Sequence, residues 1–104
     1  MSLITFSLQS GSNGNCIYVE AGDARLLFDA GISGKHAEGR MRVRDRQIRD
    51  VDALLISHDH NDHVRCAGVL HRKFDIPVWM TRPTRTAVQC HLGPLREDNH
   101  FTST

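Results

Sequence analysis

The sequence predicts an α/β fold in which a mixed sheet is flanked by helices, and three observations lead to this prediction. Residues 3–29 contain three short apolar runs separated by turn residues, as in an antiparallel meander. Later in the chain, apolar runs of strand length alternate with segments of helical periodicity, as in parallel strands joined by helices. Hydrophobic residues make up 39% and charged residues 24% of the 104 residues, as in an ordinary globular chain.

The meander is expected to consist of three strands. Residues 3–9 alternate apolar and polar side chains, which is the pattern of a half-buried strand. A turn rich in glycine and asparagine precedes a second apolar run at 16–19. A Gly-Asp turn then leads into a third strand at 25–29, which ends where Ala30-Gly31 breaks the pattern.

Helices and strands are expected to alternate in the rest of the chain. The periodicity predicts helices at about 35–49, 64–74 and 83–90, and strands at 52–57 and 76–80. The 52–57 run is continuously apolar, so we expect it to be buried on both faces of the sheet. No regular element is predicted from Gly93 to Thr104.

Positive charge is concentrated in one segment, although the formal net charge is only +1. Residues 40–49 contain five arginines against the single acid Asp45. Such a segment could contact phosphates. The alternative, which we favour, is the solvated face of a surface helix.

Cysteine usage and the absence of targeting patterns point to a cytoplasmic protein. The three cysteines, Cys16, Cys66 and Cys90, are odd in number and widely spaced, so we expect small buried apolar residues in a reducing compartment rather than a disulfide framework. No signal-peptide pattern is visible at the N-terminus. No apolar run approaches the roughly 20 residues of a membrane span, so no membrane partner is expected.

The strongest chemical signal is a cluster of histidines and aspartates that directly follows the buried strand at 52–57. Imidazole nitrogen and carboxylate oxygen are ligands that zinc accepts. In an extended segment His58 and His60 point to the same side and can bind one ion. The chain can then turn so that Asp62 and His63 face a second ion, and two ions roughly 3.5–4 Å apart can share a bridging hydroxide. A solvated polar loop is the alternative.

Three stretches resemble motifs of a known family. His58–His63, with the pattern His-x-His-x-Asp-His, resembles the second motif of the metallo-β-lactamase superfamily, whose fold is an αββα sandwich. Leu27–Gly31 resembles the first motif of that superfamily. Ser10–Cys16 resembles the opening hairpin of its YycJ-like branch, which includes VicX and WalJ. The resemblance extends over residues 3–86.

The resemblance implies a role for each motif residue. His58 and His60 would bind one metal ion, and Asp62 and His63 a second. Two zinc ions are expected in the complete domain, although manganese or iron also accepts this donor set. Asp62 would also act in catalysis by positioning the metal-bound hydroxide. Asp29 would accept a hydrogen bond from a ligand histidine and orient it; a simple strand-end carboxylate is the alternative.

The same resemblance implies an enzyme. Members of the superfamily hydrolyse their substrates with a hydroxide bound to two metals, and the YycJ-like branch suggests exonuclease cleavage of phosphodiester bonds in DNA. Hydrolysis of a thioester, lactone or β-lactam would use the same residues. The alternative from a different class is a non-catalytic metal-binding module that interacts through its basic segment.

Two departures from the family pattern affect these expectations. Cys66 stands where the branch usually has glycine, and we favour a packing role for it over a stray metal ligand or an oxidation-sensitive site. The three later metal ligands of the superfamily have no counterpart: His71 and His91 lie on predicted helices as partly buried or surface residues, and His100 is expected in a surface loop.

The missing ligands lead to a prediction about domain organisation. A two-metal site needs roughly three to five protein ligands per ion, whereas this motif supplies two to each. We therefore expect residues 1–104 to form a single partial domain, the N-terminal half of an αββα fold. One apolar sheet face would then be uncovered, and the chain by itself would be inactive.

Overall fold

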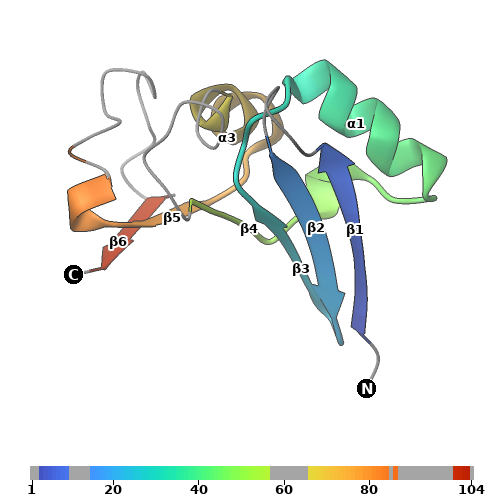
Figure 1. Ribbon diagram of the computed structural model, residues 1–104, viewed down its shortest axis with the longest axis horizontal. Helices are drawn as coiled ribbons and strands as arrows, with labels where there is room; N and C mark the ends of the chain where they lie inside the picture. Colours follow the sequence, from blue (N-terminus) through green and yellow to red (C-terminus); the bar gives the residue numbers. More distant parts are fainter. Residues whose placement is uncertain (1–2, 10–14, 57–65, 85, 87–99, 104) are drawn as a thin grey trace.

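A six-stranded mixed sheet organises the chain, in the order β1-β2-β3-β4-β5-β6 (Figure 1). The computed structural model describes residues 3–9, 15–56, 66–84, 86 and 100–103. The strands are β1 (Leu3–Gln9), β2 (Cys16–Ala21), β3 (Ala24–Phe28), β4 (Ala53–Leu55), β5 (Val78–Thr81) and β6 (His100–Ser103). The first three strands pair antiparallel, and β3 to β6 pair parallel. The predicted meander and the parallel strands that follow it are confirmed.

Two helices connect the parallel strands on one side of the sheet. Helix α1 (Gly34–Val43) and the short 3₁₀-helix η1 (Ile48–Asp50) lie between β3 and β4, and α3 (Ala67–Phe74) precedes β5. Figure 1 shows α1 and α3 on the same side of the strands. Within the described part of the chain, neither helix has the length and apolar character that crossing a bilayer requires.

The arginine-rich helix is shorter than the predicted 35–49. The hydroxyl of Ser33 caps its start by accepting a hydrogen bond from the backbone N–H of His36 (3.3 Å). The helix ends at Val43, and two residues later Asp45 adopts a positive φ of 59°. A left-handed residue cannot continue an α-helix, so the chain turns there and the buried Ile48 enters the core from η1 instead.

The core lies between the helices and one face of the sheet. Cross-strand register places one row of side chains opposite each other along this face: Tyr18, Leu27, Leu54 and Val78. All four are fully buried, and they share one cluster with Met41 of α1 and Leu70 of α3. Burial of this row is what the apolar runs at 16–19 and 52–57 predict.

The opposite face of the sheet is apolar and partly open. Its central row consists of Ile17, Phe28, Leu55 and Trp79. Ile17 and Trp79 are 40% and 45% exposed, and Phe28 and Leu55 are half-buried. Helices α1 and α3 contribute to the core on the other face. These two helices therefore cover one face of the sheet.

Residues 100–103 contradict the prediction that no regular element follows Gly93. They form β6, which runs parallel to β5 with His100 opposite Val78 and Ser103 opposite Thr81. The prediction of a surface loop at His100 was therefore wrong. A four-residue run that includes threonine and serine has no apolar alternation of its own, so main-chain pairing with β5 specifies this strand rather than a local pattern.

His71 also differs from its prediction as a partly buried or surface residue. It is fully buried in α3, and its Nδ1 lies 2.9 Å from the carbonyl oxygen of Ile76. Because a carbonyl only accepts, Nδ1 carries the proton and donates. This hydrogen bond ties the last turn of α3 to the segment that enters β5.

We expect the His71→Ala substitution to lower the free energy of unfolding by about 1–3 kcal/mol, because the buried carbonyl of Ile76 would lose its partner. Urea denaturation followed by the fluorescence of Trp79, the single tryptophan, measures the change. The matched control is His36→Ala, which removes an exposed histidine and should change stability by less than about 0.5 kcal/mol. Equal effects of the two substitutions would contradict a structural role for His71.

Candidate functional site

One edge of the sheet collects the segments to which sequence reasoning assigned chemistry. β3 ends at Phe28 and β4 ends at Leu55, and these two residues are register partners on neighbouring parallel strands. Asp29 therefore lies at the same edge of the sheet as the end of β4, which precedes the segment 57–65. Because β2 runs antiparallel to β3, its first residue, Cys16, lies at this edge as well. In parallel sheets, this carboxyl edge is where binding sites form.

The four predicted metal ligands belong to the segment that follows β4 and lie outside the described residues: His58, His60, Asp62 and His63. Among the described residues, no three histidine, cysteine, aspartate or glutamate side chains gather in a way that could hold a metal ion. The ligand assignment stays a prediction. The structure contributes the positions of the residues on either side of the segment and of Asp29 beside them.

Two consecutive residues after β3 hold both ends of the segment 57–65. The backbone N–H of Asp29 donates to the carbonyl oxygen of Leu55 (2.8 Å), just before the segment. The carbonyl oxygen of Ala30 accepts from the backbone N–H of Cys66 (2.8 Å), just after it. The entry and the exit of the predicted metal motif are thus both fixed next to Asp29.

Asp29 itself occupies an unusual backbone conformation. Its φ is 70°, in the left-handed region, where aspartate and asparagine are tolerated better than most residues. The residue is only 6% exposed. A buried carboxylate requires hydrogen-bonding partners, so a position beside a ligand histidine would suit it. Asp29 lies at the edge of the sheet next to the residues that flank the segment 57–65, and its role toward a ligand histidine stays a prediction.

Two cysteines lie near this carboxylate, and both are free thiols. Burial raises the pKa of the Cys16 thiol to about 12, and the negative charges of Asp29 and Cys66 add to the shift. Cys16 therefore stays protonated at neutral pH, whereas zinc binds the thiolate. Cys66 is half-buried at the N-cap of α3. Both positions agree with the expected packing roles.

Part of the arginine-rich segment stabilises the fold. Arg46 forms an ion pair with Glu20 (Nε–Oε1 3.3 Å), and the same carboxylate accepts a hydrogen bond from the hydroxyl of Tyr18 (2.6 Å). These hydrogen bonds from Tyr18 and Arg46 lower the pKa of Glu20. On the exposed side of α1, Arg42 pairs with Glu38 at 3.6 Å. The preferred prediction of a solvated helix face holds only for part of the segment.

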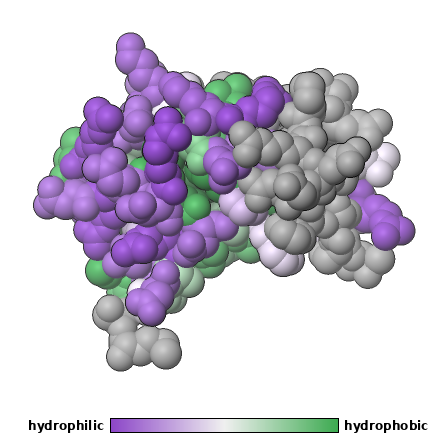
Figure 2. Space-filling view, turned by 180° about the vertical axis from the view of Figure 1, so that it is seen from behind, coloured by the Kyte–Doolittle hydropathy of each residue, from purple (hydrophilic) through white to green (hydrophobic). Residues whose placement is uncertain are grey.

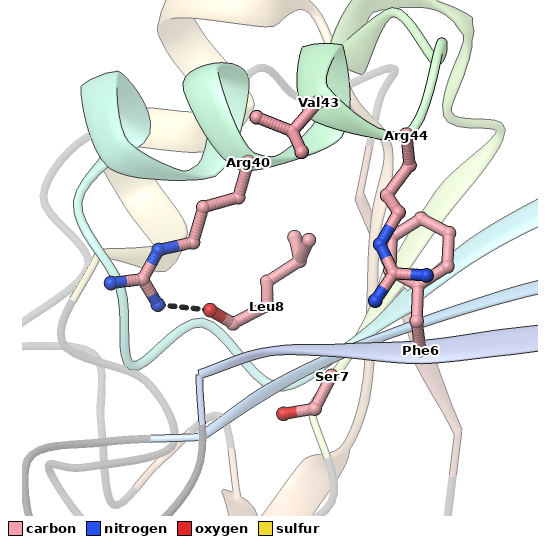
Figure 3. A pocket seen from close by; sticks show the side chains of 6 residues that line it. All are labelled: Phe6, Ser7, Leu8, Arg40, Val43 and Arg44. Atoms are coloured by element: carbon pink, nitrogen blue, oxygen red, sulfur yellow. Dashed lines mark hydrogen bonds between the residues drawn. The ribbon is translucent and has the colours of Figure 1, made fainter.

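A second part of the segment lines a surface pocket that sequence reasoning missed. The pocket has a volume of about 200 Å³ and lies between β1 and the C-terminal half of α1 (Figure 3). Its lining consists of Phe6, Ser7, Leu8, Arg40, Val43 and Arg44. The four-residue spacing of Arg40 and Arg44 is visible in the sequence, but their neighbours on β1 are about thirty residues away and no local pattern links them.

Comparison with known proteins identifies the family. Residues 10–88 match the model of the Metallo-beta-lactamase superfamily. This match covers the three stretches whose motifs resemble the superfamily. The chain belongs to the metallo-β-lactamase superfamily, as its motifs predict.

Two relatives with YycJ and WalJ names agree with the predicted branch. The chain is 40% identical over 94 residues to the exodeoxyribonuclease YycJ of Bacillus anthracis, covering 90% of this chain and 36% of the relative. It is also 40% identical over 82 residues to the exodeoxyribonuclease WalJ of Streptococcus pneumoniae (strain D39), covering 79% of this chain and 30% of the relative. The chain thus spans about a third of the length of these two relatives.

Solved structures confirm the fold. MEM-A1, a subclass B3 metallo-β-lactamase from a soil metagenome library, matches with a TM-score of 0.71 at 18% identity, over 96% of this chain and 43% of that structure. FEZ-1 from Legionella gormanii also matches with a TM-score of 0.71, at 10% identity, over 93% and 42%. The chain forms the N-terminal portion of the metallo-β-lactamase fold, as predicted.

The raised pKa of Cys16 predicts that its thiol is inert in the folded protein. A raised pKa favours the protonated form, so the thiol stabilises the fold below its unfolded pKa of 9.0 and loses this contribution as the pH rises towards 12. In a Cys66→Ser/Cys90→Ser variant, we expect Ellman's reagent to leave Cys16 unmodified at pH 8 and to modify it fully in denaturant. Equal rates of Cys16 modification in the folded protein and in denaturant would contradict a buried, protonated thiol.

Proposed function

We propose that the protein to which this chain belongs is a metal-dependent hydrolase that cleaves phosphodiester bonds in DNA as an exonuclease. The observation that carries this proposal is the 40% identity over most of this chain to two proteins named exodeoxyribonucleases. The anchoring of the segment 57–65 beside Asp29 supports it, because a two-metal site needs its ligands held in fixed positions. The free thiols agree with a cytoplasmic enzyme, which is where we place it.

The donor set of the predicted motif fits two divalent metal ions. His58 and His60 would hold one ion, and Asp62 and His63 the other, with zinc as the metal that suits these imidazole and carboxylate donors. Bound at these residues, the ions would activate a water molecule and polarise an oxygen of the scissile phosphodiester. The remaining ligands would come from sequence that the relatives have and this chain does not match.

The chain's own carboxylates would have separate tasks in this reaction. Asp62 would orient the attacking water by accepting a hydrogen bond from it. Asp29 would accept a hydrogen bond from the ring N–H of a ligand histidine. This hydrogen bond would fix the tautomer and the orientation of the ring. The buried, left-handed position of Asp29 would restrict the movement of its carboxylate and favour this second task.

Other substrates are less well supported than DNA. The solved structures MEM-A1 and FEZ-1 are metallo-β-lactamases, but at 18% and 10% identity they support the fold and not the substrate. Hydrolysis of a thioester or a lactone would use the same metal-binding residues. Loops rather than the fold decide the substrate. A non-catalytic module that binds DNA through its basic segment is the remaining alternative.

We expect His58→Ala and Asp62→Ala to abolish exonuclease activity, since each substitution removes a ligand from one of the two proposed ions. The measurement is metal-dependent release of nucleotides from 5′-labelled duplex DNA by the full-length protein. A thioester and a cephalosporin, assayed in parallel, test the other substrate classes.

The control for these substitutions is His36→Ala, an exposed histidine on α1, which should leave turnover unchanged. Retained turnover in both motif variants would contradict the two-metal proposal. Cleavage of the thioester or the cephalosporin without cleavage of DNA would contradict the proposed substrate.

A further inference from the structure

We propose that the pocket between β1 and the C-terminal half of α1 contacts the phosphodiester backbone of the DNA strand, with Arg44 and Arg40 as the contacting residues. The identity of the ligand rests on the proposed function. The contact itself rests on four features of the pocket: its fixed arginines, their charge, its apolar lining and its position in the sheet.

Both guanidinium groups are held by β1. Arg40 donates to the carbonyl oxygen of Leu8 and to Oε1 of Gln9, the latter at 3.3 Å. The guanidinium carbon of Arg44 lies 4.9 Å from the ring centroid of Phe6. Figure 3 shows the two arginines on opposite sides of the opening, with Leu8 between them. Such restraint lowers the entropy that these long side chains lose when they bind a ligand.

Among the described residues, no neighbouring carboxylate balances the charge of these two arginines. Within the part of the chain that the structure describes, Arg25 and Arg46 pair with Glu20, and Arg42 pairs with Glu38. Across the same described residues, no carboxylate oxygen lies within 4.0 Å of the guanidinium of Arg40 or Arg44. Figure 2 shows hydrophilic side chains gathered over the half of the molecule that contains α1. The pocket is therefore suited to an anion, and guanidinium groups match phosphate geometry.

The lining between the arginines is mostly apolar. Val43 is 82% exposed at its rim, Phe6 is half-buried, and the buried Leu8 and the polar Ser7 complete the lining. A small inorganic anion would gain nothing from such a surface. A nucleotide offers both a phosphate for the arginines and a sugar and base for the apolar side chains, which is the combination that binds single strands.

The position of the pocket agrees with a substrate that also reaches the predicted metal segment. Leu8 and Gln9 end β1 at the edge where β2 begins and β3 ends. β1 lies three strand spacings from β4, whose end precedes the segment 57–65, a distance of roughly 14 Å. A DNA strand advances about 3.4 Å per nucleotide in a duplex, so the two places are about four nucleotides apart. One strand can contact both.

The test compares two arginines of the same segment. Arg44→Gln removes a pocket charge, and Arg42→Gln removes an equal charge that is already paired with Glu38. Affinity for a fluorescein-labelled single-stranded oligodeoxynucleotide is measured by anisotropy, with EDTA present to prevent cleavage. We expect Arg44→Gln to weaken binding about fivefold and to reduce the slope of log K against log salt by about 0.7, the loss of one phosphate contact. Arg42→Gln should change affinity less than twofold.

Equal effects of the two substitutions, or no effect of Arg44→Gln, would overturn the pocket as a DNA contact. Circular dichroism melting curves of both variants establish that neither effect comes from unfolding. The outcome is separable from the proposed hydrolase: selective loss of binding in Arg44→Gln upholds the contact even if the protein shows no nuclease activity. Nuclease activity with unchanged binding in Arg44→Gln overturns the contact and leaves the hydrolase proposal standing.

Discussion

The account depends on two backbone hydrogen bonds made by consecutive residues. Asp29 donates to Leu55 at the end of β4, and Ala30 accepts from Cys66 at the start of α3. Both ends of the segment that carries the predicted metal ligands are therefore tied to one short stretch after β3. The positive φ of Asp29 occurs at this junction, so the same backbone bend that ends the strand also brings the two hydrogen bonds together. The sheet edge therefore fixes the positions of the residues that flank the predicted metal segment.

The sequence contained enough information to predict the sheet and the motif but not every element. Alternating side chains in β1 and the continuous apolar runs in β2 and β4 report burial directly, because a strand has a period of two residues. The predicted metal motif was visible because it directly follows the run in β4. The end of α1 and the existence of β6 were missed because a left-handed Asp45 and main-chain pairing to β5 leave no apolar pattern. Burial of His71 was missed for a related reason: its partner is a backbone carbonyl.

The arginine-rich segment shows how one stretch of sequence can serve two purposes. Arg46 anchors the segment to β2 through Glu20, which also bonds to Tyr18. Arg40 and Arg44, on the neighbouring turn, carry charge that no described carboxylate balances. Composition alone cannot separate these roles, because all the arginines contribute equally to the net charge. The separation comes from the strands that each side chain meets: Arg46 bonds to β2, whereas Arg40 and Arg44 contact β1.

The central claim is that Asp29 connects the fold to the metal site, and Asp29→Asn tests it most directly. Asparagine tolerates the left-handed conformation and has the same size, but it lacks the negative charge that would hold a ligand histidine. Zinc affinity of the full-length protein, measured in competition with a chromophoric chelator, should fall by about 10- to 100-fold, while the urea midpoint stays nearly unchanged. Unchanged zinc affinity in a folded Asp29→Asn protein would contradict the account.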